Sequence, residues 1–225
     1  MKIQKLLIAL PIVSVACFAL QPALAASTSQ ASMAAQVKSA DPVVFLRGIS
    51  DELLARLKTD RSQIQANPKH VYQIVNQILV PYVDVSRMAR SVVPRSIWMA
   101  SSPADQQAFS QAFLNIVVRT YSSALNAYTD QTIKYFPIRG GYQGKNQVQV
   151  NSQIVRSDGP PVEIIYRLAK NGSQWKVYDM TVEGVSLLQS FRSQFAAEFS
   201  SMSSKSNALA QLTQKLKQHE AQTNG

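Results

Sequence analysis

Apolar residues follow a helical spacing through the first half of the chain. They recur at intervals of three and four residues, which predicts helices over about 42–59, 71–79 and 85–91. A longer periodic stretch begins at Ser102-Pro103, and one of its faces is unusually aromatic. That face carries Phe109, Phe113, Ile116, Val117, Thr120, Tyr121, Ala124 and Tyr128.

From residue 132 onward, apolar and polar residues alternate instead. Alternation and the turn sequences Gly140-Gly141 and Asn171-Gly172 predict about four antiparallel strands, over roughly 131–139, 146–156, 162–170 and 174–182. Two more helices should follow Gly184, the first rich in phenylalanine. Helices followed by a meander of strands predict an α+β fold, in which helices cover one face of a curved antiparallel sheet. Such layers either pack into a solid core or enclose a cavity.

Both ends of the chain are expected to lie outside the folded domain. Residues 1–25 have the pattern of a secretory signal peptide: two lysines, an apolar run and Ala23-Leu24-Ala25, after which we expect cleavage. Cys17 fits a lipoprotein site poorly, because Ser14 stands where an aliphatic residue is expected. Residues 26–40 should form a disordered arm and 219–225 a frayed tail. A single domain over 41–218 remains.

The charge of the chain is strongly positive, at a formal +10. Basic residues are scattered rather than gathered in the run or stripe typical of nucleic-acid binding, so no nucleic-acid partner is expected. Attraction to anionic lipid headgroups, attraction to an acidic protein and simple solubility all remain open. The only cysteine would leave with the signal peptide, so no disulfide framework is expected.

Residues suited to catalysis are sparse. His70 and His219 are both expected to be surface residues, and no cluster has the spacing of metal ligands. The best candidates for acid and base chemistry are Asp179 and Glu183. We favour a structural ion pair of one of them with Arg192 over catalysis. The chain is therefore not expected to be an enzyme, or to need a cofactor or a metal.

Three adjoining segments carry a specific resemblance: 175–179 (WKVYD), 182–187 (VEGVSL) and 191–195 (FRSQF). With the upstream Tyr82-Val83-Asp84 and Met88-Ala89, they make the chain closely similar to the MlaC family of periplasmic phospholipid-binding proteins, also called toluene-tolerance proteins. The resemblance covers about 41–216. The chain departs from the family pattern at Val85 and at Val93-Pro94.

The resemblance implies a fold like that of nuclear transport factor 2 with extra helices, enclosing an apolar pocket for lipid tails. It implies a monomeric periplasmic carrier, which shuttles phospholipid between the outer and inner membranes and maintains outer-membrane lipid asymmetry. The implied partners are the MCE-domain subunit of an inner-membrane ABC-type lipid transporter and an outer-membrane lipoprotein bound to a porin. The bound phospholipid would be cargo rather than a cofactor.

The expected lipid-binding residues come from the aromatic helix face, the strands and the segments around them. They are Tyr82, Met88, Trp98, Phe109, Phe113, Val117, Tyr121, Ile164, Tyr166, Val177, Val185 and Leu188. Two alternatives stay open. A small-molecule isomerase or hydrolase on the same fold would need Asp179 or Glu183 unpaired in the cavity, whereas an envelope interaction module would have a filled core and no lipid.

Overall fold

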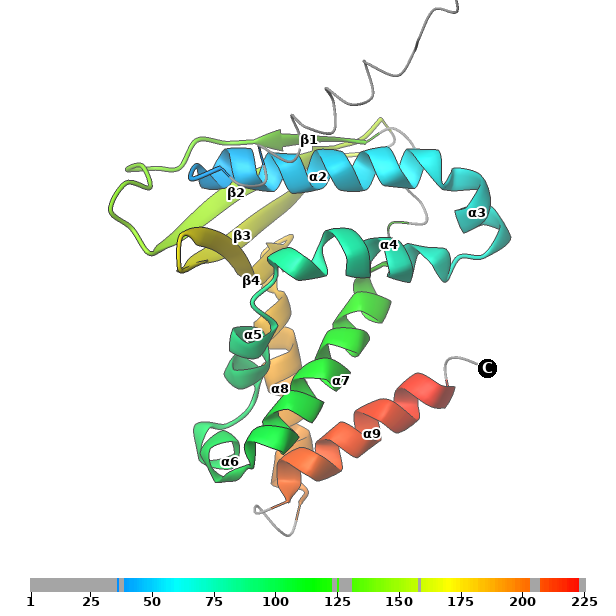
Figure 1. The fold of residues 1–225 in the computed structure, drawn as a ribbon, viewed down its shortest axis with the longest axis vertical. Helices are drawn as coiled ribbons and strands as arrows, with labels where there is room; N and C mark the ends of the chain where they lie inside the picture. The colour runs from blue at the N-terminus through cyan, green and yellow to red at the C-terminus, as the bar shows by residue number, and fades with distance from the viewer. Residues whose placement is uncertain are drawn as a thin grey trace, which may run out of the picture.

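An antiparallel sheet forms one end of the molecule, and helices extend away from it (Figure 1). The computed structural model describes residues 36, 39–122, 125, 131–157, 159–202 and 207–222. The predicted signal peptide and most of the predicted arm lie outside the described residues, as do Ala124 and Tyr128. No helix of the described part is long and apolar enough to cross a membrane.

The sheet confirms the predicted α+β class, with one strand more than expected. Its order is β1-β2-β3-β4-β5, and every neighbouring pair is antiparallel. The strands are β1 (Thr132–Tyr135), β2 (Gln147–Val155), β3 (Val162–Asn171), β4 (Gln174–Val182) and the short β5 (Val185–Ser186). In β2, buried Val148, Val150 and Ser152 alternate with exposed polar residues, so one face of the sheet is packed and the other is polar.

The predicted helices form, and short helices appear between them. They are α2 (Pro42–Thr59), α3 (Arg61–Ala66), α4 (His70–Ile78), the 3-10 turn η1 (Val80–Tyr82), α5 (Val85–Val92), α6 (Arg95–Ala100), α7 (Pro103–Ser122), α8 (Leu187–Ser200) and α9 (Ala208–Gln222). The Asp41 carboxylate caps α2 by accepting the amide N–H of Val43 at 2.8 Å. At the other end of the chain, α9 continues past His219, where we expected fraying, to Gln222.

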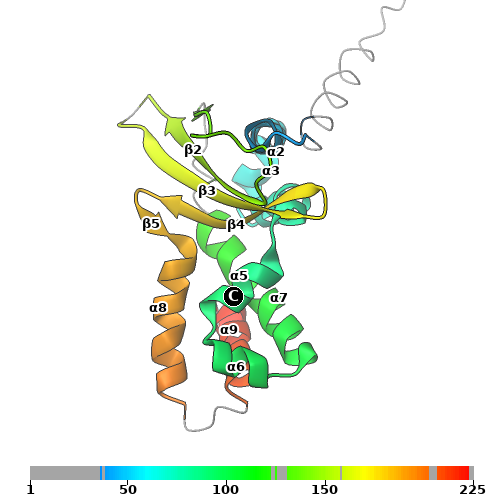
Figure 2. The same cartoon turned by 90° about the vertical axis from the view of Figure 1, so that its left-hand side faces the viewer.

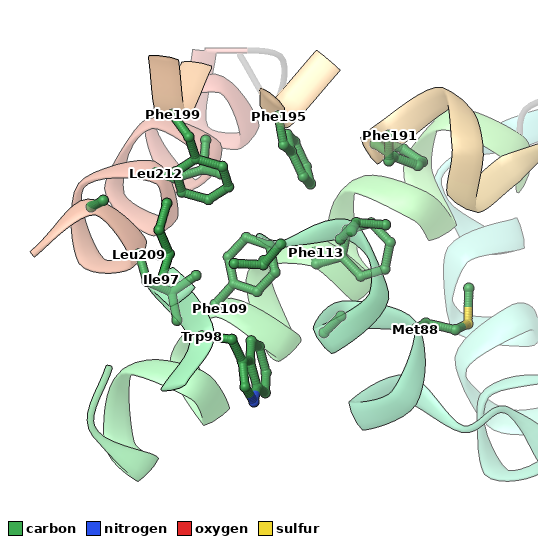
Figure 3. Packing of buried hydrophobic residues seen from close by; sticks show 14 of the residues in the cluster. Met88, Ile97, Trp98, Phe109, Phe113, Phe191, Phe195, Phe199, Leu209 and Leu212 are labelled. Atoms are coloured by element: carbon green, nitrogen blue, oxygen red, sulfur yellow. The ribbon is translucent and has the colours of Figure 1, made fainter. Parts of the chain in front are cut away.

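The buried apolar residues form three separate clusters. The sheet cluster joins α2 to the packed face of the sheet, for example through Phe45, Val150 and Trp175. A second cluster joins α2, α3, α4 and α7, and its Val71 and Ile74 are fully buried. The third, which we call the helical cluster, lies among α5 to α9 and is rich in aromatic rings (Figure 3).

Candidate functional site

Three arginines line a pocket of about 500 Å³ where α5 and α8 meet the sheet. Arg87 comes from α5, Arg167 from β3 and Arg192 from α8. Figure 2 shows α8 leaving the edge of the sheet at β5 and running alongside the other helices. The remaining lining residues are Ser91, Tyr178, Asp179, Ser186, Leu188 and Gln189.

A buried carboxylate, that of Asp179, lines this arginine pocket. Only 2 % of Asp179 is exposed. Its oxygens accept the amide N–H of Met180 at 2.8 Å, the hydroxyl of Ser186 at 2.9 Å and the amide N–H of Leu188 at 3.2 Å. Because Ser186 in turn caps α8 by accepting the Gln189 amide N–H, this carboxylate fixes the start of α8 on β4.

The charged partner of Asp179 is Arg167, whose Nη1 lies 3.3 Å from the carboxylate. The predicted ion pair with Arg192 is therefore wrong. Asp179 and Arg167 face each other across neighbouring strands, whereas Arg192 is exposed on α8 and forms no ion pair with any residue the structure describes. Glu183 instead accepts the amide N–H of Glu163. The enzyme alternative required Asp179 or Glu183 to be unpaired, but both carboxylates have hydrogen-bond partners.

The other two arginines are held differently. The Arg87 guanidinium lies over the Tyr178 ring, 3.9 Å from its centroid, in a cation–π contact. The Arg167 side chain is 48 % exposed, because a single N–H contact to Asp179 leaves most of the guanidinium in water. The pocket thus presents guanidinium N–H donors to solvent from three elements.

An apolar region adjoins the arginine pocket. Ile116, Val117, Tyr178, Met180 and Leu188 are partly buried and pack against the helical cluster, so we call them the junction residues. They come from α7, β4 and α8, where the helices meet the sheet. Tyr178 and Leu188 also line the arginine pocket, so these two side chains belong to both the polar pocket and the apolar junction.

Most of the residues predicted to bind lipid belong to, or pack against, the helical cluster or the sheet cluster. Met88, Trp98, Phe109 and Phe113 are buried inside the helical cluster, with Val117 and Leu188 at its edge. Its rings contact one another: the Phe113 and Phe191 centroids are 5.2 Å apart, and those of Phe109 and Phe113 6.1 Å (Figure 3). These aromatic residues fill a core between helices.

The remaining predicted residues lie nearer the sheet or at the surface. Tyr82, Tyr166 and Val177 pack against the sheet cluster, and Ile164 is buried on β3. Tyr121 is 37 % exposed, and Val185 is 63 % exposed. A role of the twelve residues in lipid binding stays a prediction. Sequence reasoning missed Arg87 and Arg167, which have no distinguishing motif and are brought together only by the fold.

Two hydrogen-bonded polar clusters lie outside the arginine pocket. His70 was expected at the surface without a buried partner, which is wrong: its Nε2 lies 2.8 Å from the buried Asp60 carboxylate, where α2, α3 and α4 meet. Hydrogen bonds from His70 and Arg56 lower the pKa of Asp60. Beneath α2, burial raises the pKa values of Tyr135 and Tyr166, so both hydroxyls stay neutral.

Within the described ranges, no group of His, Cys, Asp and Glu could hold a metal ion.

Comparison with known proteins adds independent observations. The sequence profile described as "MlaC protein" matches residues 47–218. The chain is 30% identical over 160 residues to the toluene tolerance protein ttg2D of Pseudomonas putida, covering 71% of this chain and 74% of that protein. It is 26% identical over 156 residues to the intermembrane phospholipid transport system binding protein MlaC of Haemophilus influenzae, covering 68% and 72%.

A solved structure also matches. It is the phospholipid-binding protein from Ralstonia solanacearum in complex with a phospholipid. The TM-score is 0.73 at 31% sequence identity, and the alignment covers 82% of this chain and 99% of that chain. The fold described above is therefore one in which a relative holds a phospholipid.

Proposed function

Because the chain belongs to the MlaC family, we propose that it is a periplasmic phospholipid carrier. It would shuttle lipid between the outer and inner membranes, as the soluble component of an ABC-type lipid transport system that maintains outer-membrane lipid asymmetry. The Ralstonia relative in complex with a phospholipid and the Haemophilus phospholipid transport protein support the choice of cargo.

The observation that carries the proposal is that the apolar junction and the arginine pocket share Tyr178 and Leu188. The junction residues are partly exposed, and they lie at the edge of the helical cluster, where α7 and α8 meet β4. Opening the molecule at the edge of a cluster, where side chains are only partly buried, costs less than opening a filled core. The acyl chains would enter at the junction, leaving the glycerol and headgroup at the arginine pocket in water.

Energetics explain why such a carrier needs no catalytic group. Sheltering two acyl chains of about 14 methylenes each is worth ~20 kcal/mol gross at ~0.8 kcal/mol per methylene, but a bilayer offers nearly the same shelter. Net transfer is therefore close to balanced, and the protein lowers the barrier of crossing water. Direction must come from partners, for which we propose the MCE-domain subunit of the inner-membrane transporter and the outer-membrane lipoprotein-porin complex.

Native mass spectrometry of protein released from the periplasm without detergent tests this function. We expect a mature chain beginning at Ala26, with bound phospholipids whose headgroups roughly mirror the host membrane. An unrelated exported protein, purified in parallel, controls for lipid carried over during preparation. Repeated preparations without lipid would favour the interaction-module alternative, and a lipid-modified Cys17 would contradict a carrier that leaves the membrane.

A further inference from the structure

The arginine pocket combines excess positive charge with an apolar wall. It holds three guanidinium groups and one carboxylate, that of Asp179. The carboxylate is occupied by Ser186, by two backbone N–H groups and by one contact to Arg167, so it neutralises the pocket only in part. Beside the charges, Tyr178 and Leu188 connect the pocket to the junction residues.

Existing contacts limit the motion of two arginines without using up their donors. The Tyr178 ring supports the face of the Arg87 guanidinium and leaves the N–H groups at its edge free to bond. Arg167 is anchored through Nη1, and the rest of its guanidinium can donate to a second anion. The amide N–H groups of Leu188 and Gln189 already donate to Asp179 and Ser186, so an anion here must be held by arginine side chains.

We propose that Arg87, Arg167 and Arg192 bind the phosphate of a phospholipid, a proposal that rests on the carrier function above. Guanidinium groups bind phosphate oxygens through paired N–H donors, and donors from three directions match a tetrahedral anion better than a planar carboxylate. The apolar wall at Tyr178 and Leu188 lies where the glycerol backbone of a lipid would continue toward the junction. Every glycerophospholipid has this phosphate, so the pocket separates phospholipids from phosphate-free lipids while discriminating little between headgroup alcohols.

Paired short-chain lipids isolate the contribution of the phosphate. Lipid-free full-length mature protein is titrated calorimetrically with dihexanoyl phosphatidylglycerol, dihexanoyl phosphatidylcholine and dihexanoylglycerol, whose chains are identical. The test variant is Arg87→Gln/Arg192→Gln, which keeps the Arg167 contact to Asp179. Arg61→Gln, at an exposed position of α3, is the control for removing positive charge.

We expect the parent to bind both phospholipids about 10- to 100-fold more tightly than dihexanoylglycerol, since each charged hydrogen bond is worth roughly a tenfold change. The double variant should bind all three lipids within a few-fold of one another, and Arg61→Gln should behave as the parent does. If the double variant melts early, Arg192→Gln alone serves, because Arg192 has no bonded partner among the described residues. We then expect a several-fold loss of affinity for the two phospholipids and no loss of affinity for dihexanoylglycerol.

The possible failures are distinguishable. Equal binding of phospholipids and dihexanoylglycerol by the parent would overturn the phosphate site and leave the carrier function standing. Absence of binding to any of the lipids would contradict the carrier function itself. Titration with inorganic phosphate is the last part of the test. Phosphate could raise the melting temperature of the parent but not of the double variant, while the parent binds the phospholipids no better than dihexanoylglycerol. In that case the pocket binds free phosphate and the lipid assignment is wrong.

Discussion

Replacing Asp179 by alanine should destabilise the protein far more than any change at Arg192. The substitution leaves the N–H groups of Met180 and Leu188 and the hydroxyl of Ser186 without their acceptor. Each buried polar group left unsatisfied costs about 1–3 kcal/mol. Because Ser186 can turn toward other groups and water can enter the pocket, we expect a total loss of about 3–5 kcal/mol of unfolding free energy.

Three further variants divide this loss into its parts. Arg167→Ala should cost only about 1 kcal/mol, because its guanidinium is half exposed and its contact to the carboxylate is screened. Arg192→Ala should change stability by less than about 0.5 kcal/mol. Asp179→Asn should fall between Asp179→Ala and the arginine variants, since its carbonyl oxygen still accepts N–H bonds but the charge is gone.

Urea denaturation of lipid-free protein, followed by circular dichroism, measures all four variants on one scale. Lipid must be removed because a bound ligand adds its own stabilisation. If Asp179→Ala came within about 1 kcal/mol of Arg192→Ala, the carboxylate would not be what fixes the start of α8. A large loss in Arg192→Ala would instead restore the pairing that the structure rejects.

Two further predictions concern the junction and the acid stability of the fold. Val117→Trp should stay folded, lose no more than the ~1–3 kcal/mol of unfolding free energy typical of overpacking, and lose most of its bound phospholipid. Gln107→Trp, at an exposed position of the same helix, should keep its phospholipid. Full lipid retention by Val117→Trp, measured as a lipid-to-protein ratio, would remove this position from the lipid site. The lowered pKa of Asp60 means that its contribution to stability is present above the unfolded-state pKa and is lost as pH falls through the folded-state pKa. Asp60→Asn should therefore be less stable than the parent at neutral pH, and in urea melts the difference should shrink as the pH falls through the folded-state pKa of Asp60. A difference that stays constant with pH would show that the ionised form has no special role.

Helix boundaries were predictable where capping and periodicity agree. At α2, Asp41 supplies the cap, Pro42 begins the helix, and the predicted range 42–59 matches the structure. The short helices α3 and α6 were not predicted. Each spans 6 residues, fewer than two turns, too few for a helical repeat to stand out from a loop.

The partner of Asp179 could not be predicted, because a β-bulge sets it. Counting back from the Asn171-Gly172 turn pairs Leu168 with Val177, and a regular ladder would next place Arg167 opposite Tyr178. The register shifts between Arg167 and Leu168, which brings Arg167 opposite Asp179 instead. The same shift leaves Tyr178 at the pocket beneath Arg87, so one irregularity forms both contacts.

The aromatic face of α7 could be predicted from the sequence, but the helix that packs against this face could not. Phe109 and Phe113 on α7 meet Phe191 and Phe195 on α8, and each pair is spaced four residues apart. Matching stripes on two helices fill one another's space, as ridges fit into grooves. A single-sequence pattern cannot distinguish a stripe that covers a ligand from one that covers another helix, because both require the same apolar surface.

Release of the cargo limits how tightly an arginine pocket should hold phosphate. Since transfer of the acyl chains between bilayer and carrier is nearly balanced, any net attraction at the headgroup adds directly to retention, with about tenfold slower release for each ~1.4 kcal/mol. Buried, water-free arginines would hold the phosphate strongly enough to trap it. Here Arg192 is exposed and Arg167 is half exposed, so water competes for their donors. Arginines placed at the surface therefore suit a carrier that must recognise a phosphate and also give it up.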